Sequence, residues 1–395
     1  MNKNIKLAVA GAVLALSASA NAGIIIPAGE WSVDISGNVN SFMNNTKHKG
    51  GATVNGGIAG GGSNNTVNSQ GVGLLPNFLS VSGTTRQNDL DVTWLISIQP
   101  GGDVGSALSG GTQNNRQAFL TFGDKSWGSI KLGKDLGVFA SDAILSDMTL
   151  LGVGAGAGLG NATYGRIGTG YIYADWKSQI QYTTPNMNGF QATVAVSNAW
   201  NLSRSNTDTL SMITTNRGGG NPAYEGKASY SFSGDTVSGK LWVSGIMQKV
   251  GGGPLQSDDP TAYAGDVGIN ANIAGFGLTG YYYDGKGIGS TGQFLDAYSA
   301  AGRARKSNGG YVQATYVLPT KTKAGFSFGS SKLDLASQES NTTLVRANDM
   351  MTFGLYHPIT KHLNLVGEYS HIKSENHAGA ENKTNNVSFG GIVFF

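Results

Sequence analysis

"LDVTWLISI", residues 90 to 98, carries apolar side chains at every second position. The apolar set is Leu90, Val92, Trp94, Ile96 and Ile98, and the alternating polar set is Asp91, Thr93 and Ser97. Successive side chains of a β-strand point to opposite faces of the sheet. The stretch therefore predicts a strand with one apolar face and one polar face.

The same period returns along the whole chain in segments bounded by Gly, Asn, Asp or Pro. It predicts sixteen strands, at 31–43, 77–87, 89–99, 115–123, 128–134, 176–184, 189–199, 223–233, 236–248, 262–273, 276–284, 309–318, 321–332, 349–357, 362–373 and 386–395. Tight turns alternate with long polar loops such as 44–76, 201–222, 249–261 and 285–308. An even number of strands joined by short and long connections in turn is typical of outer-membrane barrels.

Composition excludes several other classes of protein. The chain has 395 residues, of which 61 are glycine and 9 proline, and only 13% are charged. A helical bundle or a doubly wound sheet would not tolerate so much glycine in its elements. No cysteine is available for a disulfide or a thiolate metal site. A formal net charge of +3 offers no polybasic surface to nucleic acid, and we expect no cofactor.

The first 22 residues have the parts of a secretory signal peptide. Lys3 and Lys6 precede an apolar run from Leu7 to Leu16, and a small-residue site ends at Ala22. This run is about half of the roughly 20 apolar residues that a membrane-spanning helix needs. We expect cleavage after Ala22, which leaves residues 23–395 as one exported domain.

A closed barrel and a two-layer sandwich both account for strands with one apolar face. Within a membrane no water can pair with the backbone groups of a free edge, so a spanning sheet must close. Aromatic residues near the turn ends favour the barrel, since they suit an interfacial girdle: Trp127, Phe190, Phe232, Phe276 and Tyr316. The sequence therefore predicts an all-β, sixteen-stranded antiparallel transmembrane β-barrel.

Three stretches resemble known outer-membrane proteins. "NNVSFGGIVFF" (385–395) resembles their last strand, whose final aromatic residue, here Phe395, helps the assembly machinery to recognise the chain. "RQAFLTFGDKSWGSIKLGKDLGVF" (116–139) and "FGLYHPITKHLNLVGEYSHIK" (353–373) resemble strands of the Gram-negative trimeric general porins. The resemblance implies a homotrimer in the outer membrane of a Gram-negative bacterium, surrounded by lipid and lipopolysaccharide, with a third loop that folds into the pore.

The segment 135–175 stands where that constriction loop is expected, and it is too long for a compact connection without a function. Its acids, Asp135, Asp142 and Asp147, would face basic wall residues across a narrow aqueous passage. The pore candidates also include seven basic residues: Arg86, Arg116, Lys131, Lys134, Arg166, Lys177 and Lys227.

Strand parity divides these basic residues. Arg86, Lys131, Lys177 and Lys227 fall on the inward parity, whereas Arg116 and Lys134 fall on the outward parity, against the family's use of basic residues there. An outward charge at mid-membrane would cost about 2 to 4 kcal/mol. We therefore expect Arg116 and Lys134 to lie at a rim or to point inward.

Other motifs give weaker signals. Gly-x-x-x-x-Gly-Lys occurs three times, at 128–134, 234–240 and 280–286, but never with the Ser or Thr that a phosphate loop requires next. Gly325 to Gly329 matches a nucleophile elbow, with Asp334 and His357 following, but on a straight strand. The histidines show no metal-binding spacing, and loop carboxylates such as Asp258 and Asp259 leave a calcium site open.

The function expected is passive diffusion of small hydrophilic solutes and ions, without enzymatic activity. Basic inward residues on the first six strands favour anions, including organic acids. Lumen acids such as Asp91, Glu225 and Asp266 oppose that preference. A channel specific for aromatic carboxylates is the main alternative, and a hydrolase or an adhesin carried by the barrel is a more remote one.

Overall fold

The computed structural model describes residues 23–61, 64–101, 113–156, 162–198, 221–250 and 261–395. The predicted signal peptide with its cleavage site, as well as Asp258 and Asp259, lies outside the described residues. Within these ranges, no helix has both the length and the apolar character to cross a membrane.

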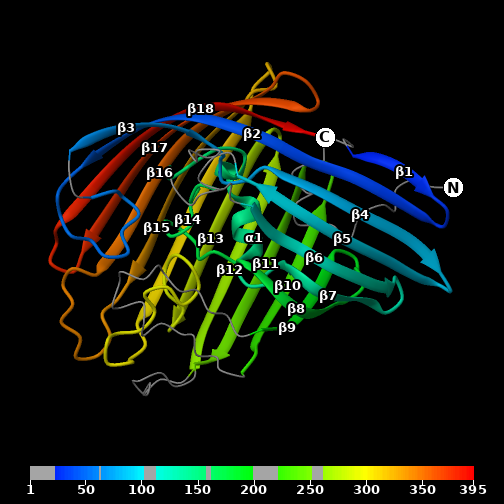
Figure 1. The fold of residues 1–395 in the computed structure, drawn as a ribbon, viewed down its shortest axis with the longest axis horizontal. Coiled ribbons are helices and arrows are strands. Elements are labelled where there is room, and N and C mark those ends of the chain that lie inside the picture. The colour runs from blue at the N-terminus through cyan, green and yellow to red at the C-terminus, as the bar shows by residue number, and fades with distance from the viewer. Residues whose placement is uncertain (1–22, 62–63, 102–112, 157–161, 199–220, 251–260) are drawn as a thin grey trace.

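Eighteen strands and two short helices make up the described chain (Figure 1). The strands are β1 (Ile24–Ala28), β2 (Trp31–Lys49), β3 (Asn65–Gly71), β4 (Phe78–Gln87), β5 (Leu90–Pro100), β6 (Gln113–Asp124), β7 (Gly128–Leu136), β8 (Trp176–Thr183), β9 (Phe190–Ser197), β10 (Ala223–Ser233), β11 (Val237–Lys249), β12 (Thr261–Ile273), β13 (Phe276–Lys286), β14 (Lys306–Val317), β15 (Lys323–Leu333), β16 (Val345–Pro358), β17 (Leu363–Asn376) and β18 (Glu381–Phe394). The helices are α1 (Ser141–Ser146) and the 3-10 turn η2 (Met148–Leu151).

The strands form one closed antiparallel sheet. Each strand from β4 to β18 pairs with the next, and β18 pairs with β2, which in turn pairs with β4. Two places in the ring are each occupied by two strands that lie end to end. β1 and β18 pair with successive parts of one edge of β2, and β4 and β3 pair with successive parts of its other edge. The ring therefore has sixteen positions, and the predicted sixteen-stranded barrel is confirmed.

The boundaries differ from the prediction mainly near the N-terminus. The strand expected at 31–43 continues to Lys49, and the loop expected over 44–76 contains β3. That part of the loop prediction is wrong. β3 was missed because its sequence, "NTVNSQG", contains a single apolar residue and so carries no alternation.

The two faces of the sheet differ as the alternation predicts. Along β2, Val39 and Met43 are exposed on the outside, whereas Asn38, Asn40 and Asn44 are buried on the inside. The aromatic residues expected to form a girdle lie near the short turns, where the rings of Phe276 and Tyr316 are 4.5 Å apart. Their placement at a lipid–water boundary stays a prediction.

The core lies inside the ring, because several loops fold into it. Figure 1 shows α1 of the third loop within the ring of strands, and α1 packs against β12. The segment 287–305 is buried too, and the Tyr173 N–H of the third loop donates to the Thr291 carbonyl, 2.8 Å away. Residues 50–61 also reach the wall, where the Ile58 N–H donates to the Asn348 side chain. These loops supply the apolar core that a hollow barrel would lack.

Candidate functional site

The third loop, residues 137–175, is attached to the wall at its start by a carboxylate of β10. The backbone N–H groups of Val138 and Phe139 both donate to Glu225 Oε2, at 2.8 Å each. The other oxygen of Glu225 forms an ion pair with Lys177 of β8. Charge-assisted hydrogen bonds of this kind are stronger than neutral ones. The first turn of the loop is therefore fixed by a side chain that is itself neutralised.

Helix α1 is held by the next strands. The N–H of Ala140, which has a left-handed φ of 62°, donates to Asp266 Oδ2 of β12 at 3.2 Å. Within α1, Asp142 forms ion pairs with Lys227 of β10, at 2.8 Å, and with Lys240 of β11. Burial acts to raise the pKa of Asp142, but the two ammonium groups outweigh it and hold the pKa below its usual value. The carboxylate is therefore ionised, and it fastens the helix to the wall.

The far arm of the loop is attached to β17. The N–H groups of Val153 and Gly154 donate to Glu368 Oε2 at 2.8 Å each, and Tyr356 donates its hydroxyl to Glu368 Oε1 at 2.6 Å. Three wall carboxylates, Glu225, Asp266 and Glu368, thus accept hydrogen bonds from the loop backbone. Glu225 and Asp266 were expected as acids of the lumen face, and Glu368 was not singled out at all.

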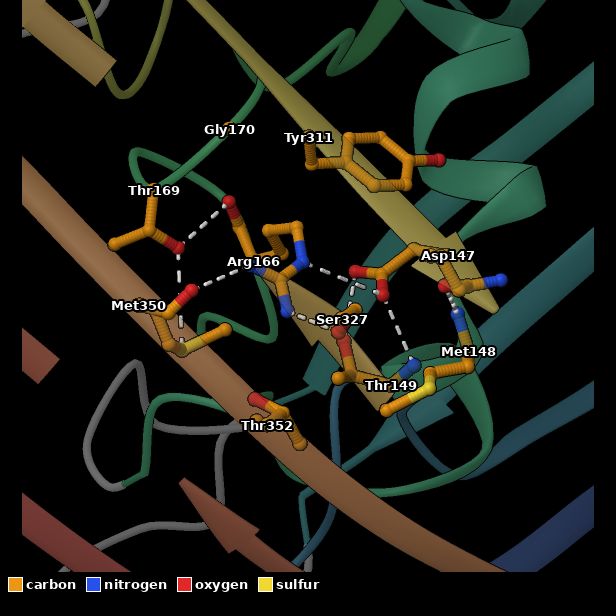
Figure 2. A network of polar contacts seen from close by, with 12 residues as sticks. Asp147, Met148, Thr149, Arg166, Thr169, Gly170, Tyr311, Ser327, Met350 and Thr352 are labelled. Atoms are coloured by element: carbon orange, nitrogen blue, oxygen red, sulfur yellow. Dashed lines mark hydrogen bonds and ion pairs between the residues drawn. The ribbon is translucent and has the colours of Figure 1, made fainter. Parts of the chain in front are cut away.

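A buried network joins the third loop to β15 and β16 (Figure 2). Arg166 is fully buried and donates to the Met350 carbonyl, at 3.1 Å, and to the Ser327 hydroxyl. Its guanidinium lies 5.7 Å from the ring centre of Tyr311 and 4.0 Å from Asp147. The predicted pore candidates Arg166 and Asp147 are therefore brought together away from water.

Asp147 also organises its own part of the loop. It accepts hydrogen bonds from the Thr149 N–H at 3.0 Å, from the Thr149 hydroxyl at 2.7 Å and from the Tyr171 hydroxyl at 2.9 Å. Burial raises the pKa of Tyr171 well above its ordinary value, and the charge of Asp147 adds to the effect. Tyr171 therefore stays a neutral hydrogen-bond donor to Asp147.

From the sequence we expected the three acids to face basic wall residues across a narrow passage. In the structure they contact basic residues directly instead. Asp135 contacts Lys131 directly, Asp142 contacts Lys227 and Lys240, and Asp147 lies beside Arg166. The physical reason is that all three acids are buried, where a carboxylate without a partner would cost several kcal/mol, on the order of 3 to 5. The predicted transverse separation of charges is therefore wrong for these pairs.

Water reaches the basic members of these pairs more than the acidic ones. The side chains of Lys131, Lys227 and Lys240 are 15%, 20% and 34% exposed. Those of the acidic partners Asp135 and Asp142 are 6% and 8% exposed, and Lys177 and Glu225 are both at 1%. We call the pairs Lys131–Asp135, Lys227–Asp142 and Lys240–Asp142 the loop cluster. The surface that the loop cluster presents to the lumen is therefore basic.

The remaining basic candidates lie elsewhere. Arg86 is next to a short turn, where it forms ion pairs with Asp91 and Asp124 at 2.9 Å each, and thus lies outside the loop cluster. Lys134 pairs in register with the outward residues Ala118 and Ser178 of its neighbours. Parity, not the resemblance, therefore gives the position of Lys134.

Arg116 and Lys134 do not belong to the loop cluster, and both contact residues of neighbouring strands. The guanidinium of Arg116 lies 5.9 Å from the ring centre of Trp176, the first residue of β8. Lys134 Nζ donates to the Asn115 carbonyl at 2.8 Å. Both cations are near strand ends that carry the long loops.

Lys240, by contrast, belongs to the loop cluster and was missed, although it shares the inward parity of Trp242 and Ser244.

The hydrolase motif does not form a triad. The Ser327 side chain is fully buried on β15 and already accepts a hydrogen bond from Arg166. Asp334 follows one end of β15, whereas His357 contacts Thr322 before the other end. The eleven residues of β15 lie between Asp334 and the end where His357 is found, a length of about 35 Å at the usual rise per residue of a strand. Across the described ranges, no three His, Asp or Glu residues gather as a metal site would require.

Comparison with known proteins agrees with this architecture. The model of the Gram-negative porin family matches residues 7–377. None of the curated proteins compared with the chain matches it significantly.

Several solved structures share the fold. The outer membrane channel DcaP of Acinetobacter baumannii is 16% identical and has a TM-score of 0.67, covering 93% of this chain and 99% of its own. The anion-selective porin from Comamonas acidovorans is 16% identical, with a TM-score of 0.61, covering 93% and 100%. Salmonella typhi OmpF, in complex with daunomycin, is 12% identical, with a TM-score of 0.58, covering 93% and 100%. Because the family match extends over most of the chain and the closed barrel agrees with it, this chain belongs to the Gram-negative porin family.

Proposed function

We propose that the chain is a passive diffusion channel of the outer membrane for small hydrophilic solutes, with a preference for anions that include small organic acids. The family and the fold are those of outer-membrane channels. The observation that carries the preference is the exposure of Lys131, Lys227 and Lys240 in pairs whose acids are nearly covered.

The argument is electrostatic. A salt bridge lowers the field of its two charges at a distance, but an ion in the lumen approaches the exposed ammonium more closely than the covered carboxylate. Fixed charges act within about 8 to 10 Å at physiological ionic strength, so close approach decides which sign is attracted. Rings or rows of basic residues select anions in other pores. A related fold in an anion-selective porin is consistent with this use of the scaffold.

The test is the reversal potential of the purified protein in planar bilayers with asymmetric salt, first potassium chloride and then potassium benzoate. Lys131→Glu and Lys240→Glu should each move the potential toward cation selectivity. Lys361→Glu, which makes the same charge change at an exposed residue of a short turn, is the control. A wild-type potential directed toward cations, unchanged by either lumen substitution, would contradict the anion preference.

We also propose that residues 1–22 are removed after Ala22, and that the barrel is inserted by the assembly machinery, which reads Phe395. The mature chain then forms a homotrimer among outer-membrane lipid and lipopolysaccharide. Trimers occur among the structural neighbours, since one solved form of OmpT of Vibrio cholerae, 12% identical to this chain, is a trimer.

Native mass spectrometry of the detergent-extracted protein tests this proposal in one measurement. The expected species has three times the mass of residues 23–395. A complex of another stoichiometry, or protomers that keep the leader, would show the assembly proposal to be incorrect.

A further inference from the structure

The segment 287–305, which joins β13 to β14, is far longer than a hairpin loop, which needs about two to five residues. Ile288 and Phe294 of this segment are fully buried, and they belong to the same apolar cluster as Phe139 and Ile172 of the third loop. The segment therefore packs against the third loop inside the ring of strands. A long connection of this kind within a compact domain usually has a function of its own.

The tip of the segment is a tight turn. Phe294 and Asp296 have left-handed φ values of 67° and 56°, which residues other than glycine adopt where the surrounding contacts hold them. The Phe294 N–H donates to the Ile288 carbonyl at 2.6 Å. A Cβ built on Gly289, whose φ of 82° is also left-handed, would lie 2.2 Å from the backbone oxygen of Leu295. The turn is therefore preformed, and it can hold a neighbouring segment in place.

Gln293 lies in this turn and contacts the last residues of the third loop. Its side chain is fully buried, and its amide nitrogen donates to the carbonyls of Tyr173 and Ala174 at 3.2 Å each. Beside it, the Tyr173 N–H donates to the Thr291 carbonyl at 2.8 Å. The amide oxygen of Gln293 is buried and accepts no hydrogen bond within the described ranges. The side chain is therefore placed for its two donors, because only the nitrogen end of an amide can face two carbonyl oxygens.

The base of the segment is fixed by Arg305, which is 1% exposed. Its guanidinium forms a two-pronged ion pair with Glu339, which follows β15, at 3.0 and 2.5 Å. A further N–H of Arg305 donates to the Asp296 carbonyl at 2.8 Å. Two-pronged pairs of arginine with a carboxylate fix geometry as well as adding energy. The segment is therefore held at its base by Glu339 and at its tip by the third loop.

We propose that Gln293 is a positioning residue of the channel, and that the segment 287–305 forms the constriction together with the third loop. Wall carboxylates hold the start and the middle of the third loop by its N–H groups, and Gln293 holds its end by two carbonyl groups. Without these two bonds the end of the third loop would leave the core more often, and the passage would widen. The proposal rests on the channel function but not on the preference for anions, because its readout is conductance and not the reversal potential.

Single-channel recording of the purified protein in planar bilayers tests the proposal. Gln293→Leu keeps the approximate size of the side chain and removes both donors. It should raise the fraction of time spent in states of larger conductance about tenfold or more, because two buried hydrogen bonds are lost. Gln70→Leu, the same substitution at an exposed residue on the outer face of β3, is the matched control and should leave the records unchanged.

Gln293→Glu separates positioning from general damage to the fold. At pH 9 its carboxylate would face two carbonyl oxygens and repel them, whereas at pH 5 a protonated carboxyl group supplies one O–H donor. Burial raises the pKa of such a carboxyl group and brings its titration into this range. The time that Gln293→Glu spends in states of larger conductance should therefore approach that of the wild type at pH 5 and exceed it about tenfold at pH 9.

Two results would overturn the proposal. One is a Gln293→Leu channel whose records match those of the wild type. The other is a Gln293→Glu channel that differs from the wild type equally at pH 5 and at pH 9. If Gln293→Leu does not assemble, Gln293→Glu inserted into the bilayer at pH 5 and then brought to pH 9 decides the question alone.

Discussion

At the scale of the residue, the carboxylate of Glu368 is the contact whose loss is easiest to follow. It accepts hydrogen bonds from two loop N–H groups and from the hydroxyl of Tyr356. Hydrogen bonds to a charged group contribute about 1.5 to 3 kcal/mol each. Glu368→Gln keeps the shape but replaces one acceptor oxygen by a donor, so the backbone of Val153 and Gly154 should open more often.

Amide hydrogen exchange measures this opening. The protection of Val153 and Gly154 should fall about tenfold or more, since 1.4 kcal/mol corresponds to a factor of ten in an opening equilibrium. Glu381→Gln, at an exposed residue of β18, should not change it. Equal protection in Glu368→Gln and the wild type would mean that the loop is held by other contacts.

At the scale of the element, α1 is attached through a group whose ionisation sets a pH limit. The pKa of Asp142 lies below its usual value, so its pairs with Lys227 and Lys240 contribute stability that is complete above the ordinary carboxyl value, about 3.9. This contribution is lost as the pH falls through the lower value of the folded state. Open-channel noise should therefore stay flat from pH 7 to about 4 and rise only below that.

Asp142→Asn separates this cause from general acid unfolding. The variant should show the raised noise already at pH 7, with little further change on acidification. Asp235→Asn, in the short turn before β11, should behave as the wild type. A noise onset near neutral pH in the wild type would indicate another titrating group.

At the scale of the whole molecule, the barrel was predictable because the sixteen predicted strands show their two faces in the alternation of apolar and polar residues. The outward position of Lys134 followed from the same rule, where the resemblance suggested the pore, whereas Arg116 lies at a register shift between β5 and β6. The interior could not be predicted in this way. Glu225, Asp266 and Glu368 look like other inward polar residues, and backbone N–H groups leave no mark in the sequence. The direct pairing of Asp142 with Lys240 depends on a loop path that only the folded chain defines.

The manner in which the third loop is attached has a consequence for engineering. The wall carboxylates recognise the backbone of residues 138, 139, 140, 153 and 154, and every amino acid except proline offers the same N–H group. These anchors therefore do not themselves select the side chain at positions 138, 139 and 153, whereas Gly154 has a left-handed φ and no room for a side chain, and Asp142 is held by its own ion pairs. A designer could vary Leu145 and Leu151, which are only partly buried, without touching these anchors.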